Sequence, residues 1–403
     1  RFNMQKIAML GSGFIGRFYT DSLHGYRNKD RVVSVYSRSE ESVKKFAQDY
    51  KVPHYTNNME ESVSNKDVDV VCIALPNYLH EKAVELCCKH NKAVLCTKPL
   101  GRNAKEAKRM LEAVEKADIF AGYLEDLCYT PKFLKAMETV NNGGLGKIIW
   151  SKSRETHPGP HSDWFWDKEK AGGGCILDMG CHCIEIGRNY IGKDIRPIEV
   201  MCWGDTQVKP IDAEDHAIGL IKYENGAIGQ FEVSWTFRGG LDLRDEVMGT
   251  EGTIWVNSFL RTGFEMFTTG KGSDYVAEKA ESDSGWLFPV GDELNELGYN
   301  HMFMDMFNSL EQGKLPSETF YDGYIVNVII DACYKSIKSK KWEKVNLEIW
   351  RGKEQVDKIS TFASHDERFY LVKEEMTHYG DKKLILKNKS TGEITEKIVE
   401  KGR

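Results

Sequence analysis

The run Lys6-Ile7-Ala8-Met9-Leu10-Gly11-Ser12-Gly13-Phe14-Ile15-Gly16 joins an apolar segment to a glycine-rich turn. The turn has the pattern G-x-G-x-x-G, which becomes informative when it lies between a strand and a helix. Gly11 would make the tight turn, Gly13 would let the backbone approach a pyrophosphate, and Gly16 would let the helix pack on the sheet. The helix N-terminus favours an anion. We therefore expect a dinucleotide to contact Gly11, Gly13, Phe14, Ile15 and Gly16.

The pattern around this turn continues to about residue 128. Short apolar runs alternate with amphipathic stretches, which is typical of parallel strands joined by crossover helices. The expected strands are Lys6–Leu10, Val32–Tyr36, Val68–Ala74, Ala93–Cys96 and Ile119–Tyr123, and the expected helices include Glu41–Tyr50, His80–Lys89 and Ala104–Lys116. We predict an α/β protein whose residues 1–128 form a Rossmann dinucleotide-binding domain.

Beyond residue 128, strand-like segments follow one another with few helices between them, and Asn225-Gly226 is a strong hairpin signal. The expected strands are Lys147–Glu155, Ile198–Thr206, His216–Tyr223, Ala227–Trp235, Asp242–Gly249 and Thr253–Val256, with helices at Ile176–Tyr190, Glu293–Gln312 and Tyr321–Ser339. We predict an α+β domain with a large open, mostly antiparallel sheet over residues 129–350. Residues 351–403 form a charged extension, in which Phe369–Val372 and Lys383–Leu386 could pair.

Composition excludes several classes of protein. The chain has 403 residues and a net charge of −6, which gives no footprint for nucleic acid or an anionic membrane. No apolar run approaches the roughly 18 residues that span a bilayer. The first residues lead directly into a strand, so we expect no signal peptide. The ten cysteines contain no Cys-x-x-Cys pair and are interpreted as reduced thiols of a cytoplasmic protein.

The end of the second strand bears on the choice of cofactor. An NAD site usually has an acidic residue here, but the chain has Ser37, Arg38 and Ser39. These side chains could hold a 2′-phosphate, which favours NADP. The alternative is that Arg38 stacks on the adenine and that Ser37 and the backbone hold the ribose of NAD.

The turn after the fourth strand, Ala74–His80, should also line the cofactor groove at the carboxyl edge of the sheet. Pro76, Asn77 and His80 are therefore candidate cofactor contacts. Asn77 could instead cap the next helix, and His80 could be a structural hydrogen-bonding group.

A lysine and an Asp–His pair make up the candidate catalytic group. Lys98 follows a buried strand, and Pro99 biases it away from helical geometry. Asp178 and His182 lie four residues apart on an expected helix and so share a face. His182 could act as general base, Lys98 could polarise a hydroxyl and Asp178 could contact substrate. Lys98 is also a candidate cofactor contact. The preceding triple glycine, residues 172–174, predicts close approach to a nicotinamide or a sugar.

The segment from Glu155 to Asp167 is dense in histidine, carboxylate and tryptophan. Aromatic rings can stack on the apolar faces of sugars while polar groups bind hydroxyls, so the segment suggests a carbohydrate pocket. A packed loop is the alternative. The spacing of the histidines fits no standard metal motif, so we expect no metal. The candidate substrate contacts are Glu125, Tyr129, His157, His161, Trp164, Trp166 and Asp178.

On these motifs the chain resembles the glucose–fructose oxidoreductase and inositol dehydrogenase (Gfo/Idh/MocA) family over roughly residues 4–350. The resemblance implies hydride transfer between a sugar or polyol carbon and a nicotinamide. It also implies a second domain that binds substrate and forms homo-oligomers through its open sheet. The family's catalytic lysine, aspartate and histidine correspond to Lys98, Asp178 and His182. Thr97 departs from the family's usual glutamate, and Ser37-Arg38 departs from its usual acid.

We therefore expect an NAD(P)-dependent enzyme that oxidises a secondary hydroxyl of a sugar, glycoside or cyclitol. Oxidation of a glycoside at ring C3 and a tightly bound, internally recycled cofactor are finer hypotheses. Two alternatives stay open: a reductase of a non-sugar carbonyl or imine, and a non-catalytic dinucleotide-sensing regulator. The presence of Lys98, Asp178 and His182 together argues against the regulator.

Overall fold

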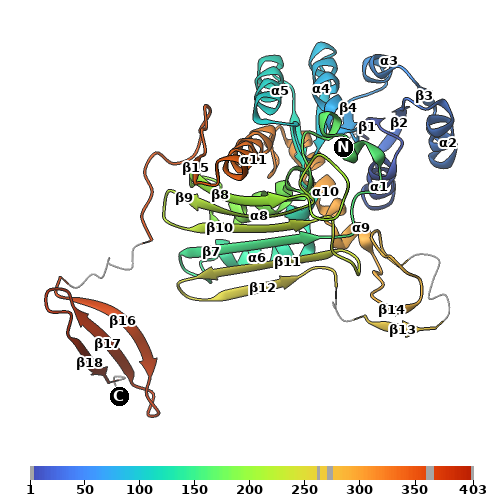
Figure 1. Cartoon of the computed structure of the whole chain (residues 1–403). Helices are drawn as coiled ribbons and strands as arrows, with labels where there is room; N and C mark the ends of the chain where they lie inside the picture. The colour runs from blue at the N-terminus through green and yellow to red at the C-terminus, as the bar shows by residue number, and fades with distance from the viewer. Residues whose placement is uncertain (1–3, 261–263, 270–275, 360–366, 401–403) are drawn as a thin grey trace. The chain divides into compact units, whose positions relative to one another are not determined.

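The computed structural model describes residues 4–260, 264–269, 276–359 and 367–400. The chain divides into two compact units, residues 1–356 and residues 357–403 (Figure 1). The larger unit contains the parallel Rossmann sheet and the mixed sheet that follows it. The smaller unit contains a separate three-stranded sheet.

The first sheet has six parallel strands in the order β3-β2-β1-β4-β5-β6. Its strands are β1 (Lys6–Leu10), β2 (Arg31–Tyr36), β3 (His54–Thr56), β4 (Val70–Ile73), β5 (Ala93–Thr97) and β6 (Ala121–Leu124). The connecting helices are α1 (Phe14–Ser22), η1 (Leu23–Arg27), α2 (Glu40–Tyr50), α3 (Met59–Ser64), η2 (Asn77–Leu79), α4 (His80–Lys89) and α5 (Ala104–Ala117). The strand order reverses beside β1, where doubly wound sheets bind nucleotides.

The glycine-rich turn has the geometry that its sequence predicts. Gly11 has a φ of +118°, and a Cβ there would lie 2.1 Å from the carbonyl oxygen of Ala74. A Cβ on Gly16 would lie 2.2 Å from the carbonyl oxygen of Gly11, so only glycine lets α1 approach β1 this closely. By contrast, nothing lies within 4 Å of a Cβ built on Gly13. The turn therefore packs on both sides and is open at its centre.

The second sheet has seven strands in the order β12-β11-β7-β10-β9-β8-β15. Its strands are β7 (Ile148–Thr156), β8 (Pro197–Asp205), β9 (His216–Tyr223), β10 (Ile228–Ser234), β11 (Asp242–Gly249), β12 (Thr253–Asn257) and β15 (Glu343–Lys344). The strand β10 runs parallel to β7, and the other pairs are antiparallel. The sheet is therefore mostly antiparallel, as predicted.

Helices cover one face of this sheet. The other elements from residue 126 to residue 339 are η3 (Asp126–Tyr129), α6 (Pro131–Asn141), η4 (Asp163–Trp166), α7 (Lys168–Ala171), η5 (Ile176–Gly180), α8 (Cys181–Ile191), β13 (Met266–Thr268), β14 (Gly285–Leu287), α9 (Glu293–Glu296), α10 (Tyr299–Gln312) and α11 (Phe320–Ser339). The helix α8 packs on β7 and β10, and α11 packs on β8. The opposite face exposes Trp203, Ile218, Met248 and Trp255.

The last helices return to the Rossmann domain. Ser22 on α1 donates to the Asn300 side chain on α10 over 2.7 Å, and α11 packs against α5. The sequence predicts one helix over Glu293–Gln312, and this prediction is wrong. Gly298 separates α9 from α10, and its φ is +88°. A Cβ there would lie 2.2 Å from the carbonyl oxygen of Asp126, so this close approach requires glycine.

Among the described residues, no helix is both long and apolar enough to cross a membrane. The smaller unit contains β16 (Phe369–Met376), β17 (Lys382–Asn388) and β18 (Ile394–Val399), paired antiparallel in that order. The predicted pairing of the first two strands is confirmed. Every residue of β18 is exposed, which explains why its sequence has no strand-like alternation.

Candidate active site

A pocket of about 300 Å³ opens between the glycine-rich turn and the second sheet. It joins the expected cofactor groove to the candidate catalytic group, because both line the same space. The predicted site residues on its wall are Gly11, Gly13, Phe14, Ile15, Ser37, Arg38, Pro76, Asn77, Lys98, His157, His161, Trp164, Asp178 and His182. The structure thus brings together segments that lie up to about 170 residues apart in the chain.

The cofactor end of the pocket fits a dinucleotide. The helix α1 begins at Phe14 with no side-chain cap, so its first N–H groups face the pocket without a competing acceptor. The open space beside Gly13 leaves room for a phosphate at this helix terminus. On the opposite wall, the Asn77 side chain donates to the carbonyl oxygen of Ala171 over 2.7 Å. Asn77 therefore links the groove to the second domain.

Of the three residues after β2, one caps a helix and two line the cofactor groove. The Ser39 side chain caps α2 by accepting from the Ser42 amide. Arg38 donates to the Tyr78 hydroxyl over 2.7 Å and lies over the Tyr78 ring. Only Ser37 and Arg38 of this triplet reach the pocket. The arrangement leaves the arginine as the one charged group of the triplet available to a ribose or its phosphate.

Lys98 and Asp178 form a buried ion pair on the far side of the groove. The Lys98 ammonium donates to the Asp178 carbonyl oxygen over 2.7 Å and to Oδ1 over 3.0 Å. Asp178 Oδ2 accepts from the Trp235 indole over 3.0 Å. Burial alone would lower the pKa of Lys98, but Asp178 and other acids raise it well above its ordinary value. Lys98 is therefore a permanent cation with one N–H left for a ligand.

The same pairing sets the charge of Asp178. Burial alone would raise its pKa, but the Lys98 cation lowers it to about 2. The carboxylate is therefore ionised, and both of its oxygens are occupied by Lys98 and Trp235. In this arrangement Asp178 orients Lys98, because its hydrogen-bonding capacity toward a substrate is already largely used.

His182 lies beside this pair, and Glu125 holds its ring. His182 Nδ1 forms a short hydrogen bond with Glu125 Oε1. Burial and the Lys98 cation lower the pKa of His182 to about 3, and burial raises the pKa of Glu125 to about 8. At neutral pH Glu125 is therefore protonated and His182 is neutral, so the pair carries no net charge and the Glu125 carboxyl donates to Nδ1. The other ring nitrogen, Nε2, then carries the ring proton, and it becomes an acceptor when Glu125 ionises and Nδ1 becomes the donor.

Two more buried acids line the pocket. Burial raises the pKa of Asp126 to about 7 and raises that of Glu155 well above its ordinary value. His157 lies at the end of β7, and burial lowers its pKa to about 3, so its ring is neutral. The Lys98 cation therefore lies among several buried groups that can hold or release a proton.

Thr97 replaces the glutamate that the resemblance leads one to expect before Lys98. Its hydroxyl accepts from the Tyr19 hydroxyl over 2.8 Å, inside the pocket wall. No carboxylate next in sequence therefore orients Lys98, and Asp178 does so from the second domain.

Five predicted residues do not line the pocket. Gly16 packs under the turn. His80 is fully buried and bonds to the carbonyl oxygens of Leu75, Pro99 and Leu100. Glu125 lies behind His182 and is fully buried.

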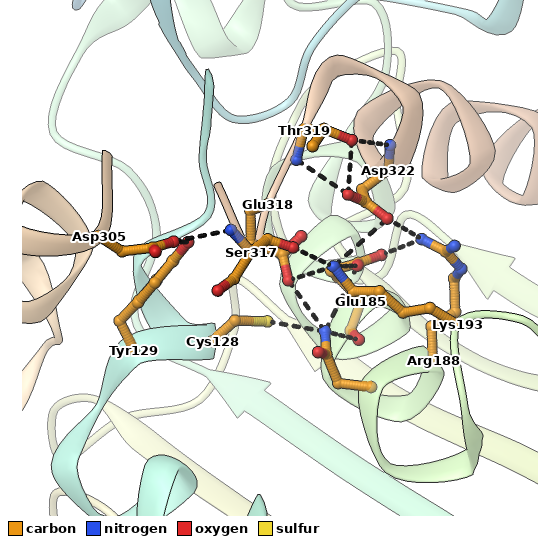
Figure 2. Close-up of polar contacts among 11 residues, drawn as sticks. Cys128, Tyr129, Glu185, Arg188, Lys193, Asp305, Ser317, Glu318, Thr319 and Asp322 are labelled. Carbon is orange, nitrogen blue, oxygen red and sulfur yellow. Dashed lines mark hydrogen bonds and ion pairs between the residues drawn. The ribbon is translucent and has the colours of Figure 1, made fainter. Parts of the chain in front are cut away.

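Tyr129 and Trp166 complete this group. The Tyr129 hydroxyl donates to Asp305 Oδ2 on α10 over 2.7 Å, and Figure 2 shows the two side chains meeting. The Trp166 ring packs edge-on against Trp235, which in turn holds Asp178. Trp166 therefore supports the site from outside it.

The triple glycine packs closely against protein, and none of its residues lines the pocket. A Cβ on Gly173 would lie 1.9 Å from the Tyr334 hydroxyl. A Cβ on Gly174 would lie 2.0 Å from the carbonyl oxygen of Glu214. The Glu214 carboxylate accepts from the amides of Gly174 and Ile176. The glycines thus let the segment before Asp178 pack against α11 and the loop before β9.

Part of the pocket wall is aromatic. The rings of Trp164 and Phe165 stack with centroids 3.7 Å apart, and the rings of Phe14 and His161 lie 5.5 Å apart. Several further lining residues were not predicted, because they are distant in sequence and belong to no motif. They include Tyr19, Phe165, Leu241, Leu243, Glu278, Lys279 and Tyr299. Among the described residues, His157, His161 and His182 do not gather within ligand distance of one metal.

A charged network fixes the helix that carries His182 (Figure 2). Glu185 and Arg188 on α8 bond to each other over 2.6 Å. Lys193, just beyond α8, contacts Glu318 over 2.7 Å and Asp322 over 3.3 Å. Burial and the Glu185 charge raise the pKa of Glu318 well above its ordinary value. The network therefore ties α8 to the start of α11.

Two family models match the chain. One, for an oxidoreductase family with an NAD-binding Rossmann fold, matches residues 5–123. The other, for the GFO/IDH/MocA C-terminal domain, matches residues 133–255. Together they cover more than half of the 403 residues.

Two relatives, both dehydrogenases, match the chain over about 300 residues. The levoglucosan dehydrogenase of Pseudarthrobacter phenanthrenivorans is 25% identical over 325 residues, covering 72% of this chain and 83% of the relative. The myo-inositol 2-dehydrogenase of Thermotoga maritima is 26% identical over 304 residues, covering 73% of this chain and 84% of the relative.

Solved structures agree on the fold. The crystal structure of GenD2 from gentamicin A biosynthesis, in complex with NAD, is 27% identical with a TM-score of 0.80. The match covers 86% of this chain and 97% of GenD2. A levoglucosan dehydrogenase complex, at 23% identity and a TM-score of 0.74, has the same fold. The chain therefore belongs to the Gfo/Idh/MocA family of oxidoreductases, whose N-terminal domain is an NAD-binding Rossmann fold.

Proposed function

We propose that this protein oxidises a secondary hydroxyl of a sugar, glycoside or cyclitol to a ketone, with NAD or NADP as hydride acceptor. The observation that carries the proposal is the single pocket that joins the open glycine turn to Lys98, Asp178 and His182. The relatives that act on levoglucosan and inositol support the substrate class.

In this reaction Lys98, His182 and Asp178 have different roles. The remaining N–H of Lys98 donates to the substrate hydroxyl and stabilises the developing alkoxide. With Glu125 ionised, Nδ1 donates to Glu125 and His182 Nε2 accepts the hydroxyl proton. Asp178 holds Lys98 in place. The dinucleotide, when bound, supplies the acceptor for the hydride that leaves the same carbon.

We propose that the substrate is a glycoside, with oxidation at ring C3 as the finer hypothesis. The aromatic part of the pocket wall, with the stacked Trp164 and Phe165 rings, supports binding of an aglycone beyond the sugar. A panel of glycosides and their free sugars tests this. Turnover of free sugars alone would reject the glycoside hypothesis.

The family match and the NAD complex of GenD2 favour NAD. Ser39 is used as a helix cap, so the predicted 2′-phosphate site has lost one of its three members. Arg38 can still meet either a ribose or a 2′-phosphate. Titration with NAD and NADP, together with mass spectrometry of any cofactor released on denaturation, decides both the identity and the retention of the cofactor.

We infer that the protein forms homo-oligomers through the open face of the second sheet. Trp255 is 74% exposed there, and Trp203, Ile218 and Met248 are exposed beside it. Light scattering of the purified protein tests this.

All ten cysteines are free thiols, which supports the expected cytoplasmic location.

The direct test of the function is a substrate panel. Methyl β-D-glucopyranoside, levoglucosan and myo-inositol are incubated with the protein and each dinucleotide, and reduced nicotinamide is followed by absorbance. We expect turnover of at least one. Replacing Lys98 by Met removes the cation and should lower the rate by about 10³-fold, without loss of dinucleotide binding.

A further inference from the structure

Glu155 is a buried carboxyl in the pocket wall that the mechanism above does not use. It is the penultimate residue of β7, on the face that α8 covers. The residue is only 7% exposed. Its Oε2 is sealed from solvent and accepts no hydrogen bond from any described residue.

Asp178, an acid of the same pocket, has a different set of hydrogen bonds. Both acids line the same pocket, and both are buried. Asp178 accepts from Lys98 and Trp235, so its charge is satisfied. Glu155 receives no such donor. A buried polar group without a partner is costly, and native structures keep few of them. The missing donor is therefore expected to come from a molecule that enters the pocket.

The neighbouring charges restrict what this molecule can be. The ionised Asp178 acts on Glu155 as a negative charge, which disfavours an anionic ligand beside it. Lys98 acts with the opposite sign and lies in the same wall. A neutral group with an O–H to donate satisfies Glu155 at no cost in charge. Sugars and cyclitols carry such groups on adjacent carbons.

We propose that Glu155 binds the substrate hydroxyl on a carbon next to the one that is oxidised. This inference rests on the proposed function, because it places the reacting hydroxyl on Lys98 and His182. The enzyme is then selective for vicinal diols within a ring. An isolated secondary alcohol, or a sugar without that neighbouring hydroxyl, leaves Glu155 unsatisfied and is a poor substrate.

A purely structural role is the competing explanation. Glu155 also lines a small internal cavity of about 10 Å³ behind the strand, together with Ser153 and Asp245. This volume is close to the least that holds one water molecule. If such a water satisfies Glu155, substitutions should alter stability alone. Ser153 lies two residues before Glu155 on the same face, bonds to Asp245 over 2.7 Å and does not line the pocket. It is the matched control.

The test compares each parent substrate with its monodeoxy analogues. Wild type, Glu155→Gln, Glu155→Leu and Ser153→Ala are assayed with methyl β-D-glucopyranoside, levoglucosan, myo-inositol and those analogues. We expect wild type to prefer the parent over one neighbouring deoxy analogue by about 10- to 100-fold in kcat/KM. Glu155→Leu should bring this ratio near one, mainly by raising KM for the parent. Glu155→Gln keeps an acceptor and should reduce the ratio by about 3- to 10-fold.

Three results separate the possibilities. If wild type oxidises none of these substrates with either dinucleotide, the proposed function fails and this inference fails with it. If wild type discriminates and the Glu155 variants keep the full ratio, only this inference is overturned. If Ser153→Ala lowers the ratio as much as Glu155→Leu, the internal cavity is responsible. Should Glu155→Leu not fold, the Glu155→Gln ratio decides alone.

Discussion

Glu125 and His182 form one titrating unit at the centre of the site. Burial raises the pKa of Glu125 to about 8, and the two side chains share a short hydrogen bond. At pH 7 the pair therefore holds one proton more than it needs to act as a base. Loss of that proton leaves Nδ1 donating to a carboxylate and Nε2 free to accept. The group that limits proton removal is thus Glu125, and not the histidine alone.

This arrangement predicts the pH dependence of oxidation. Between about pH 6 and pH 9, kcat/KM should rise with an apparent pKa near 8, because the free enzyme must lose the shared proton. Glu125→Gln cannot ionise, so its rate should be low and nearly flat over this range. Asp126→Asn is the control, since Asp126 titrates near 7 but does not bond to His182. A Glu125→Gln variant with the wild-type profile would contradict the assignment.

Gly173 gives a prediction about packing before the catalytic helix. A Cβ there would lie 1.9 Å from the Tyr334 hydroxyl, so Gly173→Ala should destabilise the protein by about 1–3 kcal/mol. Gly25→Ala is the control, because nothing lies within 4 Å of its Cβ. Chemical denaturation measures both. Equal stabilities for the two variants would show that the tyrosine moves aside freely.

At the scale of elements, the buried network around Lys193 holds α8 and α11 together. Lys193 contacts Glu185, Glu318 and Asp322 within 3.3 Å. The acids outnumber the cations in this network, so removing one cation leaves buried charge uncompensated. The stability of the helix that carries His182 therefore depends on a residue that never touches the pocket.

Lys193→Met should lower the free energy of unfolding by about 2–4 kcal/mol, since it breaks a largely buried network. Lys6→Met provides the comparison, because its ion pair with Asp67 is exposed and should contribute less than about 1 kcal/mol. Urea unfolding of both variants measures the difference. Similar losses in the two proteins would mean that the network adds no more than a surface pair.

Sequence patterns predicted the elements with strong periodicity and missed those set by distant contacts. His80–Lys89, His216–Tyr223 and Asp242–Gly249 have the predicted bounds. The strand β3 was missed because three residues, His54-Tyr55-Thr56, are too few for a pattern. The break at Gly298 depends on the carbonyl oxygen of Asp126, which lies far away in sequence.

The candidate site divides in the same way. Motifs identified Lys98, Asp178 and His182 because short-range spacing sets them, and the structure places all three on one pocket wall. The Trp235 bond to Asp178 and the isolation of Glu155 arise from strands that meet only in the folded sheet. Their roles could not be read from local sequence.

At the scale of the whole molecule, the C-terminal sheet is separate from the unit that holds the site. Residues 357–403 form their own compact unit, and the pocket is built wholly from earlier residues. Deleting residues 357–403 should therefore leave kcat and KM within about twofold of wild type and change the melting temperature little. A truncated protein that unfolds or loses activity would show that the extension stabilises the catalytic unit.

The central claim is that Lys98 and His182 act on a substrate hydroxyl beside a bound dinucleotide. The most direct measurement is the formation of reduced nicotinamide when the protein is mixed with NAD or NADP and the three panel substrates. Wild type should reduce the dinucleotide with at least one of them, and Lys98→Met should bind the dinucleotide without reducing it. Failure of wild type to reduce either dinucleotide, or full activity of Lys98→Met, would contradict the account.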